Sequence, residues 1–536
     1  PLCHLSAERN YSRVILRHKH GAKPLRKLLI LFLCACCLAA CRPFDLPLFS
    51  TPLPAPEKLG ELVVAIRSAP GFYQPAEGDA MAQGFDVDLI NAFARQLGVK
   101  PRWIVVEDAN DLTLLITSGR AHMAASYPVA EDGLRHSQPI LTTGQAIISH
   151  NSRLSLDHLA DLQNKSVAVP AGSPLGRMLR QLPEKSRPLV RDIPHTTEFN
   201  LLEQLAQDHY SLVAVHEINF EIANNFYPDL TLALKLPEKT PLGWAFPPVH
   251  QFQRRGPFRQ LIDKPVEADL PSKANAFIDD SRRNGLLDQL RDRYFGHINR
   301  ISPLGIAQFI DDMHRLLPSL RRHFWAAQQK TGIDWRLLAA LAYQESHWNP
   351  LATSPTNVRG IMMLTEDTAD HLGVDNRLDA ASSIRGGARY LEELINQLPN
   401  NIQAPDRLWL ALAGYNLGMG HLRGALAIAK DMQRDPTSWY EMKKVLPLLS
   451  RPEVYDRLKS GPARGGEAVI LVENIRTYYS ILQRLTPAKD TTSFEVFETA
   501  KPPANVKATT LQSAGQARLD VFAPSRPSTA VIPWAR

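Results

Sequence analysis

The chain has 536 residues, of which 44% are hydrophobic and 21% charged, and this ordinary composition excludes a fibrous protein and a chain disordered throughout. A chain of this length is expected to form two or three domains with full-sized cores. The formal net charge is +7, but residues 1–40 carry +6 of it, with seven bases against one acid. Because the remainder holds only about +1, the sequence predicts no nucleic-acid partner.

The cysteines are as unevenly placed as the charge, since all five lie within the first 41 residues. The rest of the chain therefore offers neither a disulfide framework nor a thiolate metal site. His347 has no second histidine at ligand spacing on its predicted helix, and we interpret it as a surface residue. The sequence predicts no metal and no cofactor.

The N-terminal residues have the pattern of a signal peptide, predicted over 1–41. A basic region is followed by the apolar run 28–40, which is too short to cross a bilayer. The run closes as Leu-Ala-Ala-Cys41, which resembles the lipobox of bacterial lipoproteins; a short buried helix with incidental cysteines is the alternative. The resemblance implies acylation of Cys41. Because Arg42 follows the cysteine, it also implies a lipid anchor in the outer membrane, with the protein on the periplasmic face.

Residues 42–57 are rich in proline and predict a semi-stiff tether. The next domain, predicted over 58–300, alternates β-branched runs with helical patterns, which favours open α/β sheets with crossover helices. The predicted strands are 61–67, 100–107, 165–170 and 210–215, and the predicted helices include 84–98 and 112–118.

Two segments of this domain resemble the family 3 periplasmic solute-binding proteins: residues 84–89 (GFDVDL) and the closing segment 277–296. The resemblance implies a two-lobed periplasmic-binding-protein-like α/β domain with a ligand cleft at the hinge. In the amino-acid binders an arginine clamps the ligand carboxylate, and Arg135 is the matching position, although its usual threonine-rich approach is missing. A solvated arginine is the alternative. The implied ligand is an amino acid or a muropeptide.

From residue 301 the strand patterns end, and residues 301–488 predict an all-α domain. The tail, 489–536, is rich in proline, alanine, threonine and serine and is predicted to be disordered. The predicted helices are 306–317, 320–331, 334–346, 365–372, 380–398, 406–416, 420–429, 436–449 and 467–485.

One of these helices places a carboxylate in its last turn. Asp334 is a typical N-cap, an apolar stripe follows, and Asn349 with Pro350 predicts the stop. Glu345 stands near this stop beside aromatic residues. Partial enclosure of a glutamate disfavours its charged form and raises its pKa towards that of a general acid. A solvated glutamate at a helix end is the alternative.

Four short segments follow one another at a characteristic spacing: Glu345-Ser, Ser354-Pro, Gly360-Ile-Met-Met and Tyr415-Asn. Together they resemble the lysozyme-like domain of the soluble lytic transglycosylase type, glycoside hydrolase family 23. The resemblance implies Glu345 as the catalytic residue and peptidoglycan glycan strands as the substrate. It also implies these supporting roles: Ser354 contacts the sugar, Gly360 lets the chain run close to the substrate, Met362 lines the groove floor, Met363 stands where many relatives have glutamine, Tyr415 lies near the glutamate, and Asn416 fixes its turn.

Ordinary glycosidases use two carboxylates, and the candidates for a second one open the predicted helix 365–372. Acidic residues are favoured at a helix N-terminus in any case, so we interpret Glu366, Asp367 and Asp370 as solvated. The mechanism implied by the family has Glu345 act first as acid and then as base, leaving 1,6-anhydromuramic acid. A goose-type lysozyme that uses water, and a lipoprotein receptor whose helical domain binds glycan without cleaving it, are the alternatives.

Overall fold

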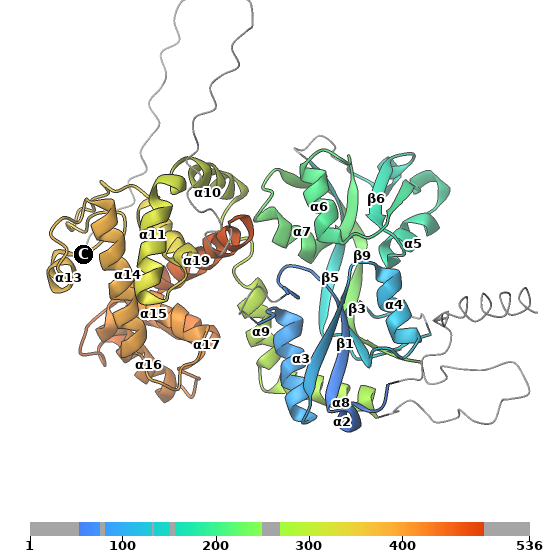
Figure 1. Cartoon of the computed structure of the whole chain (residues 1–536), viewed down its shortest axis with the longest axis horizontal. Coiled ribbons are helices and arrows are strands. Elements are labelled where there is room, and N and C mark those ends of the chain that lie inside the picture. The colour runs from blue at the N-terminus through green and yellow to red at the C-terminus, as the bar shows by residue number, and fades with distance from the viewer. Residues whose placement is uncertain (1–52, 76–80, 131–132, 151–155, 249–268, 487–536) are drawn as a thin grey trace, which may run out of the picture. The chain divides into compact units, whose positions relative to one another are not determined.

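The computed structural model (Figure 1) describes residues 53–75, 81–130, 133–150, 156–248 and 269–486. The predicted signal peptide, the candidate acylation site Cys41 and the predicted disordered tail lie outside these residues. Among the described helices, none combines the length and the apolar character needed to span a membrane.

The first domain is built on a mixed sheet of nine strands. One end of the sheet is parallel and consists of β1 (Glu61–Arg67), β2 (Lys100–Val106) and β3 (Met123–Pro128). The other end is also parallel and consists of β6 (Ser166–Pro170), β7 (Leu189–Ile193) and β8 (Val213–His216). On one face of the sheet each end has its own apolar core, whereas the core of the other face includes residues from both ends. The two parallel ends form the two lobes, which confirms the predicted two-lobed α/β fold.

Two long antiparallel strands join the lobes: β5 (Leu141–His150) and β9 (Leu230–Phe246). Strand β9 pairs with β5 along most of its length and with β3 and the short β4 (Arg135–His136) near its end. The sequence analysis missed β9 because two prolines and several charges interrupt it, a pattern more typical of a loop. The ladder tolerates them through a register shift between Gly144 and Gln145.

Helices cover both faces of the sheet (Figure 1). The chain returns to the first lobe through α8, where Phe277 stacks on Trp244 at 6.1 Å and packs on Phe93 at 5.3 Å between ring centroids. The helices of this domain are α2 (Pro56–Leu59), α3 (Phe85–Gln96), α4 (Ala109–Thr117), α5 (Pro174–Gln181), α6 (Glu198–Ala206), α7 (Glu217–Asn224), α8 (Leu270–Arg283) and α9 (Leu286–Phe295).

The end of the predicted tether belongs to the folded domain. The Leu53 amide donates to Gly119 O at 3.1 Å, and His122 Nε2 lies 2.8 Å from Pro54 O. Because the Val63 amide donates to His122 Nδ1, the imidazole proton is on Nε2 and is donated to Pro54. The prediction of a tether up to residue 57 is therefore wrong for residues 53–57.

The described residues after 301 form helices and loops. Helix α12 lies inside this bundle, with all nine residues from Trp335 to Tyr343 buried. It packs against α11 and α19 and also contacts α14. The helices are α10 (Pro303–Arg315), α11 (Leu317–Thr331), α12 (Trp335–Ser346), α13 (Glu366–Leu372), α14 (Ala380–Gln397), α15 (Asp406–Leu417), α16 (Met419–Asp431), α17 (Trp439–Val445), α18 (Pro452–Tyr455) and α19 (Gly465–Leu485).

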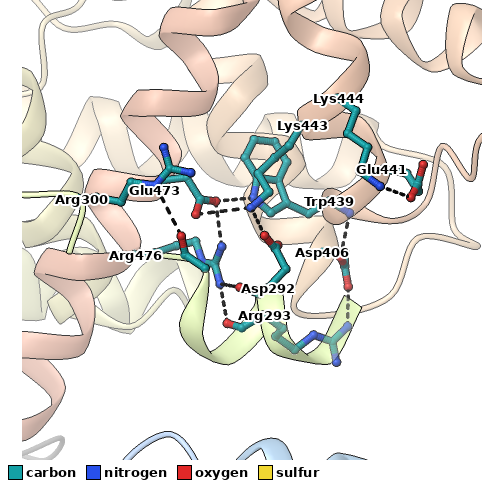
Figure 2. A network of polar contacts seen from close by, with 11 residues as sticks. Asp292, Arg293, Arg300, Asp406, Trp439, Glu441, Lys443, Lys444, Glu473 and Arg476 are labelled. Atoms are coloured by element: carbon teal, nitrogen blue, oxygen red, sulfur yellow. Dashed lines mark hydrogen bonds and ion pairs between the residues drawn. The ribbon is translucent and has the colours of Figure 1, made fainter. Parts of the chain in front are cut away.

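A buried ionic network holds three helices together around Glu473 of α19 (Figure 2). Glu473 has no exposed surface, and its carboxylate accepts 2.7 Å bonds from Trp439 Nε1 and Arg476 Nη1. Lys443 Nζ lies 3.5 Å away and also pairs with Asp292 of α9. Burial alone would raise the pKa of Glu473, but Arg476 and Lys443 hold it below the ordinary value. The charge is therefore stabilised only while its partners are present.

Substitution Glu473→Gln should destabilise the helical domain by about 3 kcal/mol, because it leaves Arg476 buried without its counter-charge and removes one of the two acids that pair with Lys443. The matched control is Glu467→Gln on the same helix, whose partner Arg464 is exposed and whose effect should stay within about 0.5 kcal/mol. Calorimetric unfolding of the two variants measures the difference. Equal losses would contradict this account of the network.

Candidate active site

The candidate catalytic residue is positioned by the two ends of α12. At the N-terminus the Asp334 side chain accepts from the Arg336 amide at 2.9 Å and caps the helix. At the C-terminus His347 and Trp348 have φ values of 51° and 59°, which end the helix at Ser346. The helix therefore ends at the last residue of the predicted helix 334–346, three residues before the stop signal at Asn349 and Pro350. The chain turns back so that Trp348 Nε1 donates to Ala339 O at 2.8 Å.

The Glu345 side chain stands in the last turn of this helix and keeps some solvent exposure. Among the residues that the structure describes, none forms a hydrogen bond or an ion pair with its carboxyl group. Burial raises the pKa of Glu345 to about 8. The carboxyl group is therefore mostly protonated at neutral pH, and it is available as a proton donor.

The turn after Glu345 is tied to the loop that carries the Gly-Ile-Met-Met segment. Ser346 Oγ donates to Ile361 O at 2.8 Å, which links this loop directly to the last turn of α12. The loop is closed by a pair of backbone hydrogen bonds between Arg359 and Leu364, of 3.0 and 2.9 Å. These contacts bring the third of the four short segments, Gly360-Ile-Met-Met, next to the turn that carries the glutamate.

Gly360 is required for a different reason from the one predicted. Its φ is +85°, and a Cβ atom there would lie 1.8 Å from Arg377 O. Arg377 also braces the loop, because its Nη1 donates to Asn357 O at 2.7 Å and to Leu364 O at 3.1 Å. The close approach at Gly360 is thus between two parts of the same chain.

Met362 acts through its backbone, and the prediction that its side chain lines the groove floor is wrong. The side chain is fully buried and faces Gly387, where any Cβ atom would lie 2.6 Å from Met362 Cε. The Met362 amide donates to Ser383 Oγ at 3.3 Å, and its carbonyl accepts from the Tyr415 hydroxyl at 2.7 Å. Met363 is partly exposed, with a φ of 47°.

Tyr415 lies close enough to Glu345 for the charge of the glutamate to affect the pKa of its hydroxyl group. Burial raises the pKa of Tyr415 well above its ordinary value, and the charges of Glu345 and Tyr390 raise it further. The Tyr390 ring packs against the Tyr415 ring at 5.2 Å between centroids. Tyr415 is thus a neutral hydroxyl that joins α15 to the loop beside the glutamate.

Two protein families match the chain, one in each of its two domains. Residues 62–297 match the bacterial extracellular solute-binding proteins, family 3, and residues 322–437 match the transglycosylase SLT domain. The chain is 38% identical over 485 residues to a membrane-bound lytic murein transglycosylase F of Methylobacillus flagellatus, covering 88% of this chain and 97% of the relative. The chain belongs to the membrane-bound lytic murein transglycosylase F family.

Other similarities differ in extent. The family member of Thiobacillus denitrificans is 41% identical over 447 residues, covering 82% of this chain and 91% of the relative. Among solved structures, the chain is similar to an ancestral arginine-binding protein bound to arginine, with 20% identity and a TM-score of 0.37. That similarity covers 44% of this chain and 98% of the other.

Three further candidate residues of the family's catalytic domain have these positions. Ser354 Oγ accepts from the Val358 amide at 3.0 Å and lies 3.0 Å from Thr356 Oγ1, so the side chain closes a local turn. Asn416 is exposed and forms no side-chain hydrogen bond with the described residues, so the predicted role in fixing the turn is not found. Glu366 is exposed and accepts from Asn357 Nδ2 at 3.2 Å.

The first domain contains the predicted cleft between its lobes. Arg67, Asp86 and Ser126 line it from one lobe, and Glu198 and Asn219 line it from the other. Arg135 is not among the lining residues, and its Nε donates to Pro247 O at 2.7 Å. The position of the Arg135 side chain does not support the predicted contact with a ligand, which remains a prediction.

Sequence reasoning missed the residues that position the site: Arg377, Ser383 and Tyr390. An arginine in a loop and a serine in a helix are usually solvated, and the sequence carries no signal that Ser383 is fully buried. Only the folded chain brings Arg377 and Ser383 against the loop 354–364 and Tyr390 against Tyr415.

Substitution Gly360→Ala should lower stability by at least about 3 kcal/mol, because backbone strain is joined by a clash with the backbone of Arg377. The matched control is Gly373→Ala, which has a φ of +65° but open space around its Cβ and should cost about 1 kcal/mol. Thermal unfolding and lytic activity of both variants test this. Similar losses in the two would show that the contact with Arg377 is unimportant.

Proposed function

We propose that the protein is a murein lytic transglycosylase, a lyase that cleaves the β-1,4 bond between N-acetylmuramic acid and N-acetylglucosamine without water. The observation that supports this proposal is the position of Glu345. Burial raises the pKa of its carboxyl group to about 8. No other carboxylate of the described residues contributes to that shift. The paired carboxylates of ordinary glycosidases lie about 5–10 Å apart and would influence each other. A single acid therefore favours a reaction in which the substrate supplies the second group.

The proposed reaction balances with one carboxyl group. Glu345 gives its proton to the glycosidic oxygen, the bond between that oxygen and C1 of the muramic acid breaks, and the substrate's N-acetyl group stabilises C1. The Glu345 carboxylate then takes the proton of the C6 hydroxyl while O6 bonds to C1. The product is 1,6-anhydromuramic acid, and Glu345 ends protonated as it began. A low-dielectric site suits this role because it returns the proton to the carboxylate.

Digestion of purified peptidoglycan by the wild type should release products with 1,6-anhydro ends, detected by mass spectrometry. Glu345→Gln should lower the rate at least about 100-fold, because the amide cannot give the proton. Glu366→Gln is the matched control and should keep the wild-type rate, since Glu366 is exposed and pairs with Asn357.

Reducing ends in the wild-type digest would instead identify a hydrolase. Undiminished cleavage by Glu345→Gln would remove Glu345 from the mechanism, and loss of activity in Glu366→Gln would point to a second catalytic carboxylate.

We further propose two domains, 53–300 and 301–488; the first extends the predicted limits of 58–300 by the residues that pack on it. The two family matches, 62–297 and 322–437, lie inside these limits and support them. The relatives are named membrane-bound, which supports a membrane-associated protein. In our proposal Cys41 carries the lipid, and the protein stands at the periplasmic face of the outer membrane.

The first domain, we infer, senses a ligand and regulates the second, and the ligand is an amino acid or a muropeptide. The supporting contact is Arg293 of α9, which lies 3.0 Å from Asp88 and 2.8 Å from Asp406 (Figure 2 shows the contact with Asp406). Asp88 stands two residues after Asp86 of the cleft, in the first turn of α3, and Asp406 begins α15, which carries Tyr415. One side chain thus joins the helix of the cleft to the helix of the active site.

Arg293→Ala should reduce the response of lytic activity to added muropeptides towards none, because it removes the ion pairs to both helices. Its neighbour Arg291→Ala is the matched control, since Arg291 is exposed and lies 3.9 Å from Asp288. The readout is the ratio of activities with and without the muropeptide. A wild-type ratio in Arg293→Ala would contradict the role of this contact, and a wild-type enzyme indifferent to muropeptides would contradict regulation.

A further inference from the structure

The cleft of the first domain is small, with a volume of about 60 Å³, and its walls are partly apolar. The apolar lining includes Ile66, Phe72, Phe199 and Leu242. Pockets of this kind gain specificity from a few polar groups that are placed to meet the ligand. The ligand class therefore depends on which polar groups of the cleft still lack partners.

Arg67 is the charged residue at the end of β1, where the strand opens into the cleft. Its guanidinium group forms no hydrogen bond or ion pair with any residue that the structure describes. An arginine side chain is always charged and carries five N–H donors in a planar fork. In a cleft with apolar walls, such a group favours an anion that can accept two parallel hydrogen bonds.

The acids of the cleft are already engaged with other groups. Glu198 accepts from the His216 amide at 2.9 Å, from His216 Nδ1 at 2.8 Å and from Asn219 Nδ2 at 2.7 Å. Burial would raise the pKa of Glu198, but His216 and, more weakly, Arg67 lower it to about 2. Asp86 accepts from Ser126 Oγ at 2.5 Å, and burial raises its pKa to about 7. Neither acid pairs directly with Arg67.

A second polar group of the same cleft also lacks a partner. Asn219 uses its amide nitrogen on Glu198, which leaves Oδ1 buried without a donor. A buried acceptor without a hydrogen bond costs about 1–3 kcal/mol, so a ligand N–H at this position would be favoured. The unmet donors of Arg67 and the unmet acceptor of Asn219 belong to opposite lobes of the cleft.

We propose that Arg67, rather than Arg135, binds the carboxylate of the ligand in this cleft, and that Asn219 Oδ1 accepts from an N–H group of the same molecule. The ligand class is an amino acid or short peptide with a free carboxylate. Because the two groups come from different lobes, one such ligand holds the lobes together. This inference rests on the proposed ligand-sensing role of the first domain.

Calorimetric titration of the purified protein tests the proposal with three probes: L-glutamate, alanyl-alanine and alanyl-alaninamide. At least one of the two carboxylate probes should bind the wild type, and Arg67→Ala should weaken that binding by about 10- to 100-fold. Arg67→Lys should retain part of the affinity. Arg95→Ala, an exposed arginine on α3, is the matched control and should bind as the wild type does.

The amide probe is compared with alanyl-alanine on the wild-type protein. This part of the test therefore does not depend on whether a variant folds. It should bind the wild type more weakly than alanyl-alanine binds, because it lacks the carboxylate. Equal binding of this matched pair, unchanged affinity in Arg67→Ala, or no binding of either carboxylate probe up to about 10 mM would overturn the proposal. Lytic activity is assayed separately on the same samples, so that a failure of the proposed enzyme activity cannot be mistaken for a failure of the ligand site.

Discussion

The catalytic domain depends on the burial of one helix. Nine consecutive residues of α12 are buried, and the helix therefore runs through the bundle and delivers its last turn to the candidate site. Glu345 takes its properties from this position, because desolvation disfavours its charged form. The surrounding contacts serve the same arrangement: Ser346 holds the loop of Gly360 and Met362, and Tyr415 closes it from α15. Hydrogen bonds thus connect the loop both to the helix of the acid and to the tyrosine.

The junction between the two domains follows a different principle. There the helices are held by charges, with Glu473 at the centre and Arg293 reaching Asp88 and Asp406. Loss of one partner leaves a buried charge uncompensated and is strongly destabilising, whereas apolar side chains can shift against one another. A network of this kind suits a junction that has a small number of defined arrangements. This physical property makes a regulatory role for the first domain reasonable.

Much of this arrangement could be predicted from the sequence. Helical periodicity and capping residues placed most helices of the catalytic domain within a few residues, and the spacing of Glu345, Gly360 and Tyr415 indicated the site. Strand β9 was missed because its prolines and charges are typical of a loop, although pairing on two sides overrides them. The role of Met362 was wrong because a motif does not reveal which side of the chain faces the core. Arg67 could not be predicted, since its lack of a partner is a property of the folded cleft.

The most direct test is a titration of the Glu345 carboxyl carbon by NMR in protein labelled with ¹³C-glutamate, assigned by comparison with Glu345→Gln. The account predicts a pKa of about 8, so that the acid form dominates at neutral pH and lytic activity falls as pH rises through that value. Because this pKa lies above the unfolded value of 4.5, Glu345 should also make the protein less stable as pH rises from 4.5 to about 8. A pKa near 4.5 would show an ordinary solvated glutamate and contradict the account.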